Sequence, residues 1–268
     1  MGVFVFSLFI ASEIAEATVS ESREAFRYVI LISTGAIVLV GLLVWFFMKT
    51  DHIAEKEIIL EKITTSQVRE VLSLPSVWLL MIIILCAYVG YKITDVFSLY
   101  AQDVMLYDQV QSAQVGTFLL FIRPAVGALI GILADRTQTT RWLFLSFVIS
   151  FFGALLFATG LISDSATVLF FISILIVATG VYAARSLYFA VMESGQIPLT
   201  LTGTAVGLIS LIGYTPDIFA GPSMGYLLDS SPGAEGHRHV FWMLALFSFI
   251  GGVAAWYYFH LYKKKKQN

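Results

Sequence analysis

Long apolar stretches limit what this chain can fold into more than any other feature. A membrane-spanning helix needs about 20 apolar residues, and lipid offers the backbone no other hydrogen-bond partner. Runs such as FISILIVATG do not alternate in polarity as the strands of a membrane β-barrel do. We therefore expect one short and seven full helical stretches, at roughly 2–12, 27–48, 77–100, 114–134, 142–162, 166–190, 202–228 and 240–262.

The composition excludes several other classes of protein. Hydrophobic residues make up 58% of the 268 residues and charged residues 13%, against about 45–50% and 25% in soluble domains. A net charge of -2 gives no signal for nucleic-acid binding. The single cysteine, Cys86, rules out an intrachain disulfide. We expect an all-α integral membrane protein whose surroundings are the lipid bilayer, with no nucleic-acid partner.

Lys and Arg residues are concentrated on one side of the expected spans, and this side is predicted to be cytoplasmic. It carries Lys49, Lys56, Lys62, Arg69, Arg136, Arg141 and the Lys263–Lys266 tail, while the other side carries Arg23, Arg27 and Arg238. The C-terminus is therefore expected inside. Apolar residues recur within the charged segment 49–76, which fits either an amphipathic helix lying on the membrane or a solvated spacer.

An internal repeat gives the most specific pattern. Residues 127–135 and 221–229 both read G-x-x-x-G-x-x-x-D, and each motif ends the middle helix of a group of three, 77–162 or 166–262. The two middle helices run in opposite directions across the membrane. This is a 3+3 inverted-topology repeat, a layout found in many secondary transporters. The glycine spacing alone also fits close helix packing.

The correspondence extends to charged residues. Arg123 in one copy and Asp217 in the other stand four residues before the first glycine of the motif. The first helices show a weaker correspondence, in which a glycine is followed five residues later by a charge: Gly90 and Asp95, Gly180 and Arg185.

Charges inside membrane spans are costly and mark functional sites. Arg123 lies about 14 Å into its span at 1.5 Å per residue, which is near mid-membrane. Lys92 and Asp95 share one helix face and can pair, and Arg185 is near enough to the inner end to reach the cytoplasm. Tyr100, Tyr182 and Tyr188 also stand beside these charges in the sequence. The candidate solute or ion pathway comprises Arg123, Lys92, Asp95, Asp217, Tyr91, Tyr214 and Arg185.

The segment 131–141, GILADRTQTTR, resembles the signature loop of the major facilitator superfamily, G-x-x-x-D-R-x-G-R-R/K. Gly131, Asp135 and Arg136 match, Gln138 replaces a glycine, and Arg141 comes one place late. The resemblance implies a gating loop formed by Gly131, Asp135, Arg136 and Arg141. The segments 193–198 and 199–217 are similar to a bacterial branch near nitrate/nitrite and organic-anion permeases.

That family has two six-helix bundles joined by a cytoplasmic loop, and this chain resembles only the second half. Residues 77–262 correspond to the C-terminal bundle and 49–76 to the central loop. Residues 1–48 correspond to the end of the fifth helix and the sixth helix, and 263–268 form a basic tail. The chain looks like an N-terminally truncated part of a transporter that lacks most of its N-terminal bundle.

The resemblance implies a bacterial inner-membrane permease working by alternating access. We expect proton-coupled transport of a small organic anion, with the anion at Arg123 and the proton on Asp95 or Asp217. The alternatives are a half-transporter that pairs with itself or with a separate N-terminal half, and an inactive fragment. An enzyme is not expected, since G-x-G-D, H-E-x-x-H and G-x-x-x-x-G-K-S/T motifs do not occur. No cofactor is expected, and His237 with His239 reads as an exposed loop pair rather than a metal site.

Overall fold

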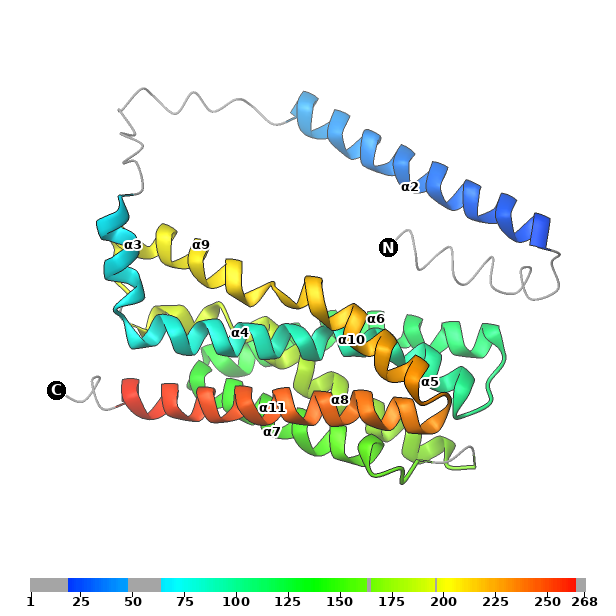
Figure 1. The fold of residues 1–268 in the computed structure, drawn as a ribbon. Helices are drawn as coiled ribbons and strands as arrows, with labels where there is room; N and C mark the ends of the chain where they lie inside the picture. The colour runs from blue at the N-terminus through cyan, green and yellow to red at the C-terminus, as the bar shows by residue number, and fades with distance from the viewer. Residues whose placement is uncertain (1–18, 48–63, 163–164, 196, 264–268) are drawn as a thin grey trace.

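The computed structural model describes residues 19–47, 64–162, 165–195 and 197–263, and every regular element in these ranges is helical (Figure 1). The expected all-α fold is thereby confirmed. The predicted segment 2–12, most of the central loop and the tail 264–268 lie outside the described residues. The elements are α2 (Val19–Phe47), α3 (Thr65–Leu72), α4 (Pro75–Ile93), η1 (Thr94–Val96), α5 (Phe97–Asp103), α6 (Gln109–Asp135), α7 (Thr139–Ala158), α8 (Thr167–Leu187), η2 (Ala190–Gly195), η3 (Leu199–Leu201), α9 (Thr202–Gly213), α10 (Pro216–Ser230) and α11 (Ala234–Lys263).

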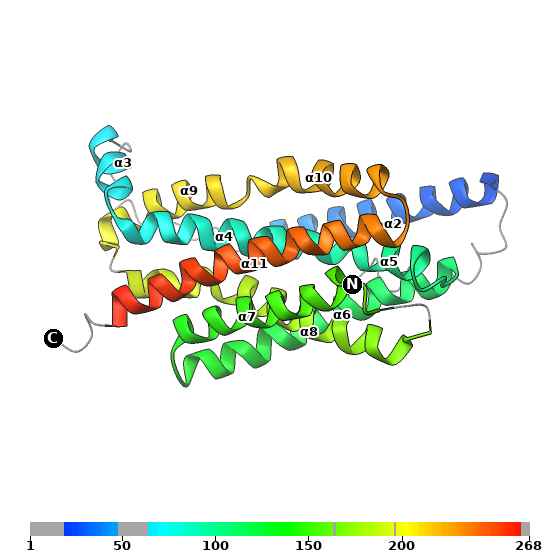
Figure 2. The same ribbon diagram turned by 60° about the horizontal axis from the view of Figure 1, so that its bottom comes forward.

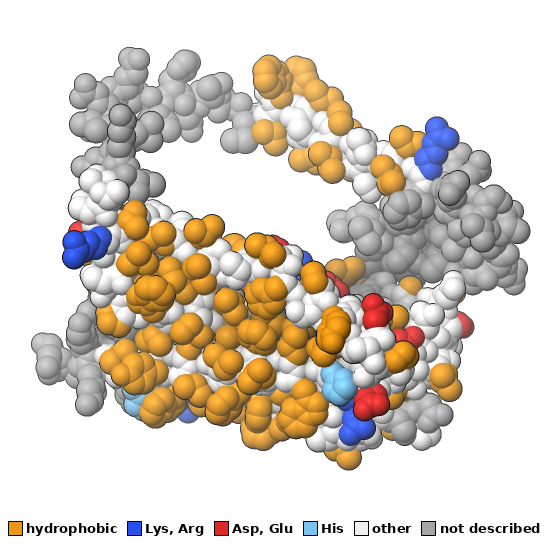
Figure 3. Space-filling model, viewed as in Figure 1, with side chains coloured by type: hydrophobic (Ala, Val, Ile, Leu, Met, Phe, Trp, Pro, Cys, Tyr) orange, Lys and Arg blue, Asp and Glu red, His pale blue; other side chains and the backbone are white. Residues whose placement is uncertain are grey.

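Seven helical segments of the described chain are long and apolar enough to cross a membrane, as expected from the sequence. Large apolar side chains cover the visible outer face, over α4, α9 and α11, and charged groups gather at its ends (Figure 3). Among the large apolar side chains of the bundle, Trp78, Phe152 and Phe249 are each more than half exposed. Such a continuous apolar surface fits lipid rather than water.

The helices of the bundle pack in a pattern that is symmetric between the two groups of three. The first helix of each group contacts the second and third helices of the other: α4 packs against α9, α10 and α11, while α8 packs against α6 and α7. The third helices, α7 and α11, pack along each other (Figure 2). This arrangement agrees with the inverted repeat predicted from the sequence.

Two glycines of the first helices occupy equivalent places in this packing. A Cβ on Gly180 would overlap the backbone of Ser150 on α7. A Cβ on Gly90 would lie 3.4 Å from Leu244 on α11 and 3.3 Å from Val181 on α8. The weaker sequence correspondence between Gly90 and Gly180 therefore has a structural counterpart, because each meets the third helix of the other group.

The G-x-x-x-G motifs themselves do not mark close helix contacts in the described chain. A Cβ on Gly131, Gly221 or Gly225 would meet nothing within 4 Å, and one on Gly127 would approach only the Ser186 hydroxyl. The interpretation of these motifs as close-packing sites was wrong for this bundle. Their faces are open because α6 and α10 lie at its margin, where few neighbours cover them.

Two of the spans are interrupted along their length. The first runs from α4 through η1 into α5, and the second breaks between Gly213 and Pro216, which starts α10. Proline lacks a backbone N–H and so cannot continue the hydrogen-bond ladder of α9. Both interruptions border the polar residues described below.

The remaining two helices, α2 and α3, precede the bundle in the chain. α2 stands apart from it, and residues 30–47 bury no side chain (Figure 1). α3 falls in the segment expected to carry an amphipathic helix, and its Val71 is fully buried. The predicted domain boundaries and the cytoplasmic placement of these segments stay predictions.

Candidate substrate site

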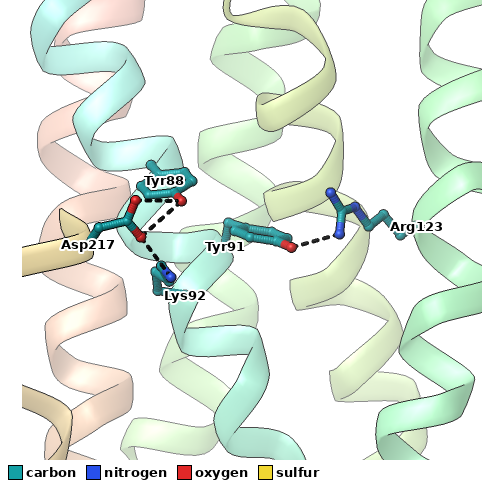
Figure 4. A network of polar contacts seen from close by, with 5 residues as sticks. All are labelled: Tyr88, Tyr91, Lys92, Arg123 and Asp217. Atoms are coloured by element: carbon teal, nitrogen blue, oxygen red, sulfur yellow. Dashed lines mark hydrogen bonds and ion pairs between the residues drawn. The ribbon is translucent and has the colours of Figure 1, made fainter. Parts of the chain in front are cut away.

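The polar residues near mid-bundle form one connected cluster (Figure 4). Lys92 Nζ lies 2.7 Å from Asp217 Oδ1, and the Tyr88 hydroxyl donates to the same carboxylate at 3.0 and 3.1 Å. The expectation that Lys92 pairs with Asp95 was wrong. Lys92 instead bridges α4 to α10, where Asp217 lies in the first turn and an anion is favoured by the helix N-terminus.

Tyr91 forms the second part of the cluster. Arg123 Nη1 donates to the Tyr91 hydroxyl at 2.6 Å, and its guanidinium lies 4.7 Å from the ring centroid. The guanidinium of Arg185, on α8, lies 4.1 Å from the same centroid. Two arginines from different helices therefore converge on one aromatic ring.

Neither guanidinium forms an ion pair within the part of the chain that the structure describes. Among the described residues, no carboxylate lies within 4.0 Å of Arg123 or Arg185, since the only ion pairs found there join Lys92 to Asp217 and His237 to Asp103. Asp217, which holds the position equivalent to Arg123 in the repeat, pairs with Lys92. Arg185 donates one hydrogen bond, to the Tyr188 hydroxyl at 3.3 Å. Most of the ten N–H donors of the two arginines thus remain available to a ligand.

Arg185 lies deeper than the sequence indicated. It contacts Tyr88 and Tyr91, and Tyr91 stands about 24 Å along α4 from Pro75 at 1.5 Å per residue. The chain continues beyond α8 through η2 to Gly195, where an added Cβ would lie 3.3 Å from the Ser76 side chain. Gly195, rather than Arg185, is therefore level with the start of α4. Arg185 lies in the last turn of α8, but the interpretation that it lies at the inner end of its span was wrong.

Two cavities adjoin the arginines. The first, which we call the arginine cavity, has a volume of about 310 Å³ and is lined by Arg123, Tyr182, Arg185, Ser186 and Tyr188. The second, the hydroxyl cavity, has about the same volume, 310 Å³, and opens between α4, α5 and α6. Arg123 and Tyr182 line both. The hydroxyl cavity is otherwise lined by Tyr91, Thr94, Asp95, Ser98, Ala113, Gly116, Thr117, Leu119 and Leu120.

The structure gathers most of the residues selected from the sequence and separates one. Tyr214 joins the cluster, because its hydroxyl lies 3.3 Å from that of Tyr188 and its ring packs edge-on against Tyr88. Tyr100 lies elsewhere, with its hydroxyl bonded to the Ile162 carbonyl. The sequence reading missed Tyr88, although its position four residues before Lys92 puts both on one helix face.

The predicted gating loop lies at the far end of α6. Asp135 is the last residue of that helix, Arg136 caps it, and Arg141 lies in the first turn of α7. All three side chains are exposed. Within the described chain, Asp135 forms no ion pair with either arginine, so its carboxylate is open to a partner outside the bundle.

His237 is not the exposed loop residue expected from the sequence. It lies in the first turns of α11, is fully buried, and its Nε2 is 3.0 Å from Asp103 Oδ2 at the end of α5. Helix α11 begins at Ala234, several residues earlier than its apolar run. Among the described residues, no group of three or more potential metal ligands occurs.

Comparison with known proteins places the chain in a family. The model of the Major Facilitator Superfamily matches residues 1–221. Inner membrane protein YqcE of Escherichia coli (strain K12) is 25% identical over 252 residues, which are 92% of this chain and 58% of YqcE. Inner membrane protein YihN of the same organism is 39% identical over 75 residues, 28% of this chain and 18% of YihN. The chain thus spans little more than half the length of YqcE. No solved structure matches it significantly. The chain belongs to the major facilitator superfamily of membrane transporters.

Proposed function

We propose that these residues form one half of a proton-coupled permease of the bacterial inner membrane that transports a small organic anion by alternating access. The observation that carries this proposal is the convergence of Arg123 and Arg185 on Tyr91, with no carboxylate of the described residues paired to either. An uncompensated cation inside a membrane costs at least about 2.5–3.5 kcal/mol. A bound anion would offset that cost for both arginines.

The chemistry of the two arginines favours a carboxylate or phosphate as the anionic group. A guanidinium presents several N–H donors in a planar fork, which matches two oxygens of such a group at once. Lys92 does not compete for the anion, because Asp217 already neutralises it. The net positive charge of the cluster therefore resides on the arginine cavity.

Asp95 is the better placed of the two carboxylates to carry the coupled proton. Asp217 is held as an anion by Lys92 and by the Tyr88 hydroxyl. Asp95 lines the hydroxyl cavity and has no ion-pair partner among the described residues. It is close enough to Arg123 to interact electrostatically. Binding of an anion at Arg123 would weaken that interaction and so favour protonation of Asp95, which couples the two events.

Alternating access requires a second bundle on the open side of the site. We infer that an N-terminal bundle, on the same polypeptide or a separate one, covers Lys92, Asp217 and the open faces of α6 and α10. The loop of Asp135, Arg136 and Arg141 would brace the cytoplasmic ends in one state. Pairing of two copies of this chain is the alternative, and the oligomeric state of the purified protein distinguishes the two.

Transport in proteoliposomes tests the proposal. The protein, together with its N-terminal bundle where that is a separate chain, is supplied with lactate, gluconate or glycerol 3-phosphate under an inward proton gradient. We expect at least one of these anions to accumulate together with protons. Arg123→Lys should reduce uptake about tenfold or more, because lysine keeps the charge and loses the fork. Asp95→Asn should abolish proton-driven accumulation and preserve anion exchange.

Tyr100→Phe provides the matched control, since Tyr100 lies in the same span as Asp95 and outside the polar cluster. It should leave both activities close to those of the parent. Normal uptake by the Arg123→Ala variant, or uptake of choline in place of the anions, would contradict the anion assignment. Proton-driven accumulation by Asp95→Asn would remove Asp95 from the coupling mechanism.

A further inference from the structure

Two further cavities follow the seam where α7 and α11 pack along each other (Figure 2). The first, which we call the apolar groove, has a volume of about 350 Å³. It is lined mostly by aromatic side chains: Phe144, Phe147, Phe151, Phe152, Phe249 and Trp256. None of its lining residues lines the arginine cavity or the hydroxyl cavity, so it is separate from the proposed substrate site.

The second cavity, the basic pocket, continues the apolar groove toward the start of α7. It has a volume of about 570 Å³ and shares Phe144 and Trp256 with the groove. Gln138, Arg141 and His260 give it a polar lining. No carboxylate of the described residues lines either cavity, and Arg141 forms no ion pair among those residues. The two cavities therefore form one feature with an apolar part and a cationic end.

Gly252 on α11 leaves space in the apolar groove. A Cβ at this position would meet only Phe147, at 3.5 Å, which is an ordinary contact. At the neighbouring Gly251, in contrast, a Cβ would overlap the Phe147 ring, so that ring lies directly against α11. A long side chain at position 252 is therefore expected to fill the groove, whereas one at position 251 would push the two helices apart.

The length of the combined cavities matches one leaflet of a bilayer. At 1.5 Å per residue, Arg141 and Phe152 are about 16 Å apart along α7. The lining residues of α11 extend over a similar length, about 18 Å from His260 to Ser248. A hydrocarbon core is about 30 Å thick, so one leaflet contributes about 15 Å. A membrane helix of a partner protein would contact the seam across the whole core, so these dimensions favour a lipid.

The position of the charge identifies the kind of lipid. Arg141 lies in the first turn of α7, at the end where a lipid headgroup would lie. Trp256, at the junction of the cavities, is a residue type enriched at the boundary between headgroups and hydrocarbon. A guanidinium binds phosphate through two parallel hydrogen bonds, and basic pockets between membrane helices bind anionic headgroups. We propose that the seam binds one anionic phospholipid of the phosphatidylglycerol type, with an acyl chain in the apolar groove and the phosphate at Arg141.

Native mass spectrometry of the purified protein tests this site, because it resolves bound lipids one at a time. The protein in detergent is titrated with dioleoyl phosphatidylglycerol, or with dioleoyl phosphatidylethanolamine, which has the same chains and phosphate without the net charge. The first phosphatidylglycerol should bind about fivefold or more tighter than the first phosphatidylethanolamine. Arg141→Gln should remove that preference. Gly252→Leu should weaken binding of both lipids about tenfold or more, because leucine occupies the groove.

Two matched variants carry the same changes outside the seam. Arg136→Gln removes an arginine from the same end of α6, and Gly207→Leu adds a leucine on α9 where a Cβ meets nothing within 4 Å. Neither residue lines the groove or the pocket. Both variants should bind the two lipids as the parent does. The readout is lipid binding rather than transport, because Arg141 also belongs to the predicted gating loop.

Phe152→Ala provides a second test of the groove that does not depend on how Gly252→Leu folds. The Phe152 side chain is 61% exposed, so its removal shortens a wall of the groove without opening the core. It should weaken binding of both lipids about threefold or more. Equal binding of the two lipids by the parent, or an unchanged preference in Arg141→Gln, would overturn the assignment of the headgroup. Unchanged lipid affinity in Phe152→Ala, or a dimer that Gly252→Leu dissociates, would overturn the assignment of the groove to a lipid.

Discussion

Tyr91 holds the site together at the scale of single residues. Its ring faces two guanidinium groups and its hydroxyl accepts a hydrogen bond from one of them. Cation–π contacts of this kind stabilise arginines at positions where no carboxylate is available. The arginines can therefore stay in place before a ligand arrives, with their remaining N–H groups directed into the cavities.

The pair formed by Lys92 and Asp217 is expected to stabilise the contact between α4 and α10. Asp217→Asn leaves Lys92 without a counter-ion, and Lys92→Met leaves the carboxylate without one. Each single variant should melt at a lower temperature than the parent in detergent, because an unpaired charge loses the compensation of its partner. The melting temperature of the variant carrying both changes should fall by less than the sum of the two single decreases.

Tyr88→Phe serves as the comparison for this cycle, because it removes the hydroxyl donor and keeps the ion pair. Its melting temperature should lie above those of both single charge variants. Strict additivity of the Lys92 and Asp217 effects would show that the two side chains do not interact in the folded protein.

The sequence alone predicted these residues better than it predicted their partners. Arg123, Asp217 and Arg185 stand out because charges are rare in apolar spans. Which charge meets which depends on the crossing of α4, α8 and α10, and spacing along one helix does not contain that information. The spacing along one helix allows Lys92 to pair with Asp95, whereas in the structure Lys92 pairs with Asp217 on another helix.

At the scale of helices, Gly180 marks a close crossing of α7 and α8. A Cβ on Gly180 would overlap backbone atoms of Ser150, and backbone cannot move aside as a side chain does. Gly180→Ala should therefore lower the free energy of unfolding by about 1–3 kcal/mol, the usual cost of overpacking. Denaturant titration in detergent measures the loss.

Gly225→Ala on α10 is the matched control, since an added methyl group there meets nothing within 4 Å. It should leave stability unchanged or raise it slightly, because alanine is the better helix former. Equal losses at both positions would mean that glycine is required for a reason other than the α7–α8 contact.

The spans could be predicted almost completely, since their length and apolarity are direct consequences of the lipid solvent. The interruption of 202–228 between α9 and α10 was not predicted, although Pro216 lies at that point. Proline is tolerated within membrane helices, as Pro124 inside α6 shows. A proline alone therefore does not tell whether a span bends, breaks or continues.

At the scale of the whole molecule, the exchange symmetry of the contacts explains why a short repeat in sequence could predict the architecture. Gly90 and Gly180 are equivalent because α4 meets α11 as α8 meets α7. The symmetry is broken in the site, where Arg123 and Asp217 hold equivalent positions with opposite charge. Both halves contribute to the site, since the two arginines come from α6 and α8 and the ion pair joins α4 to α10.

The orientation of the bundle in the membrane is predicted from the concentration of Lys and Arg on one side. Single cysteines replace Ser66 in α3 and Ser231 after α10, which the seven-span topology places on opposite sides. An impermeant maleimide should label Ser66→Cys only from the cytoplasmic side and Ser231→Cys only from the other.

Cys86 is buried and should add little background to this labelling. Gln138→Cys, in the exposed turn between α6 and α7, should label together with Ser66→Cys. Labelling of Ser66→Cys and Ser231→Cys from one common side would contradict the topology, and a complete exchange of sides would reverse the orientation.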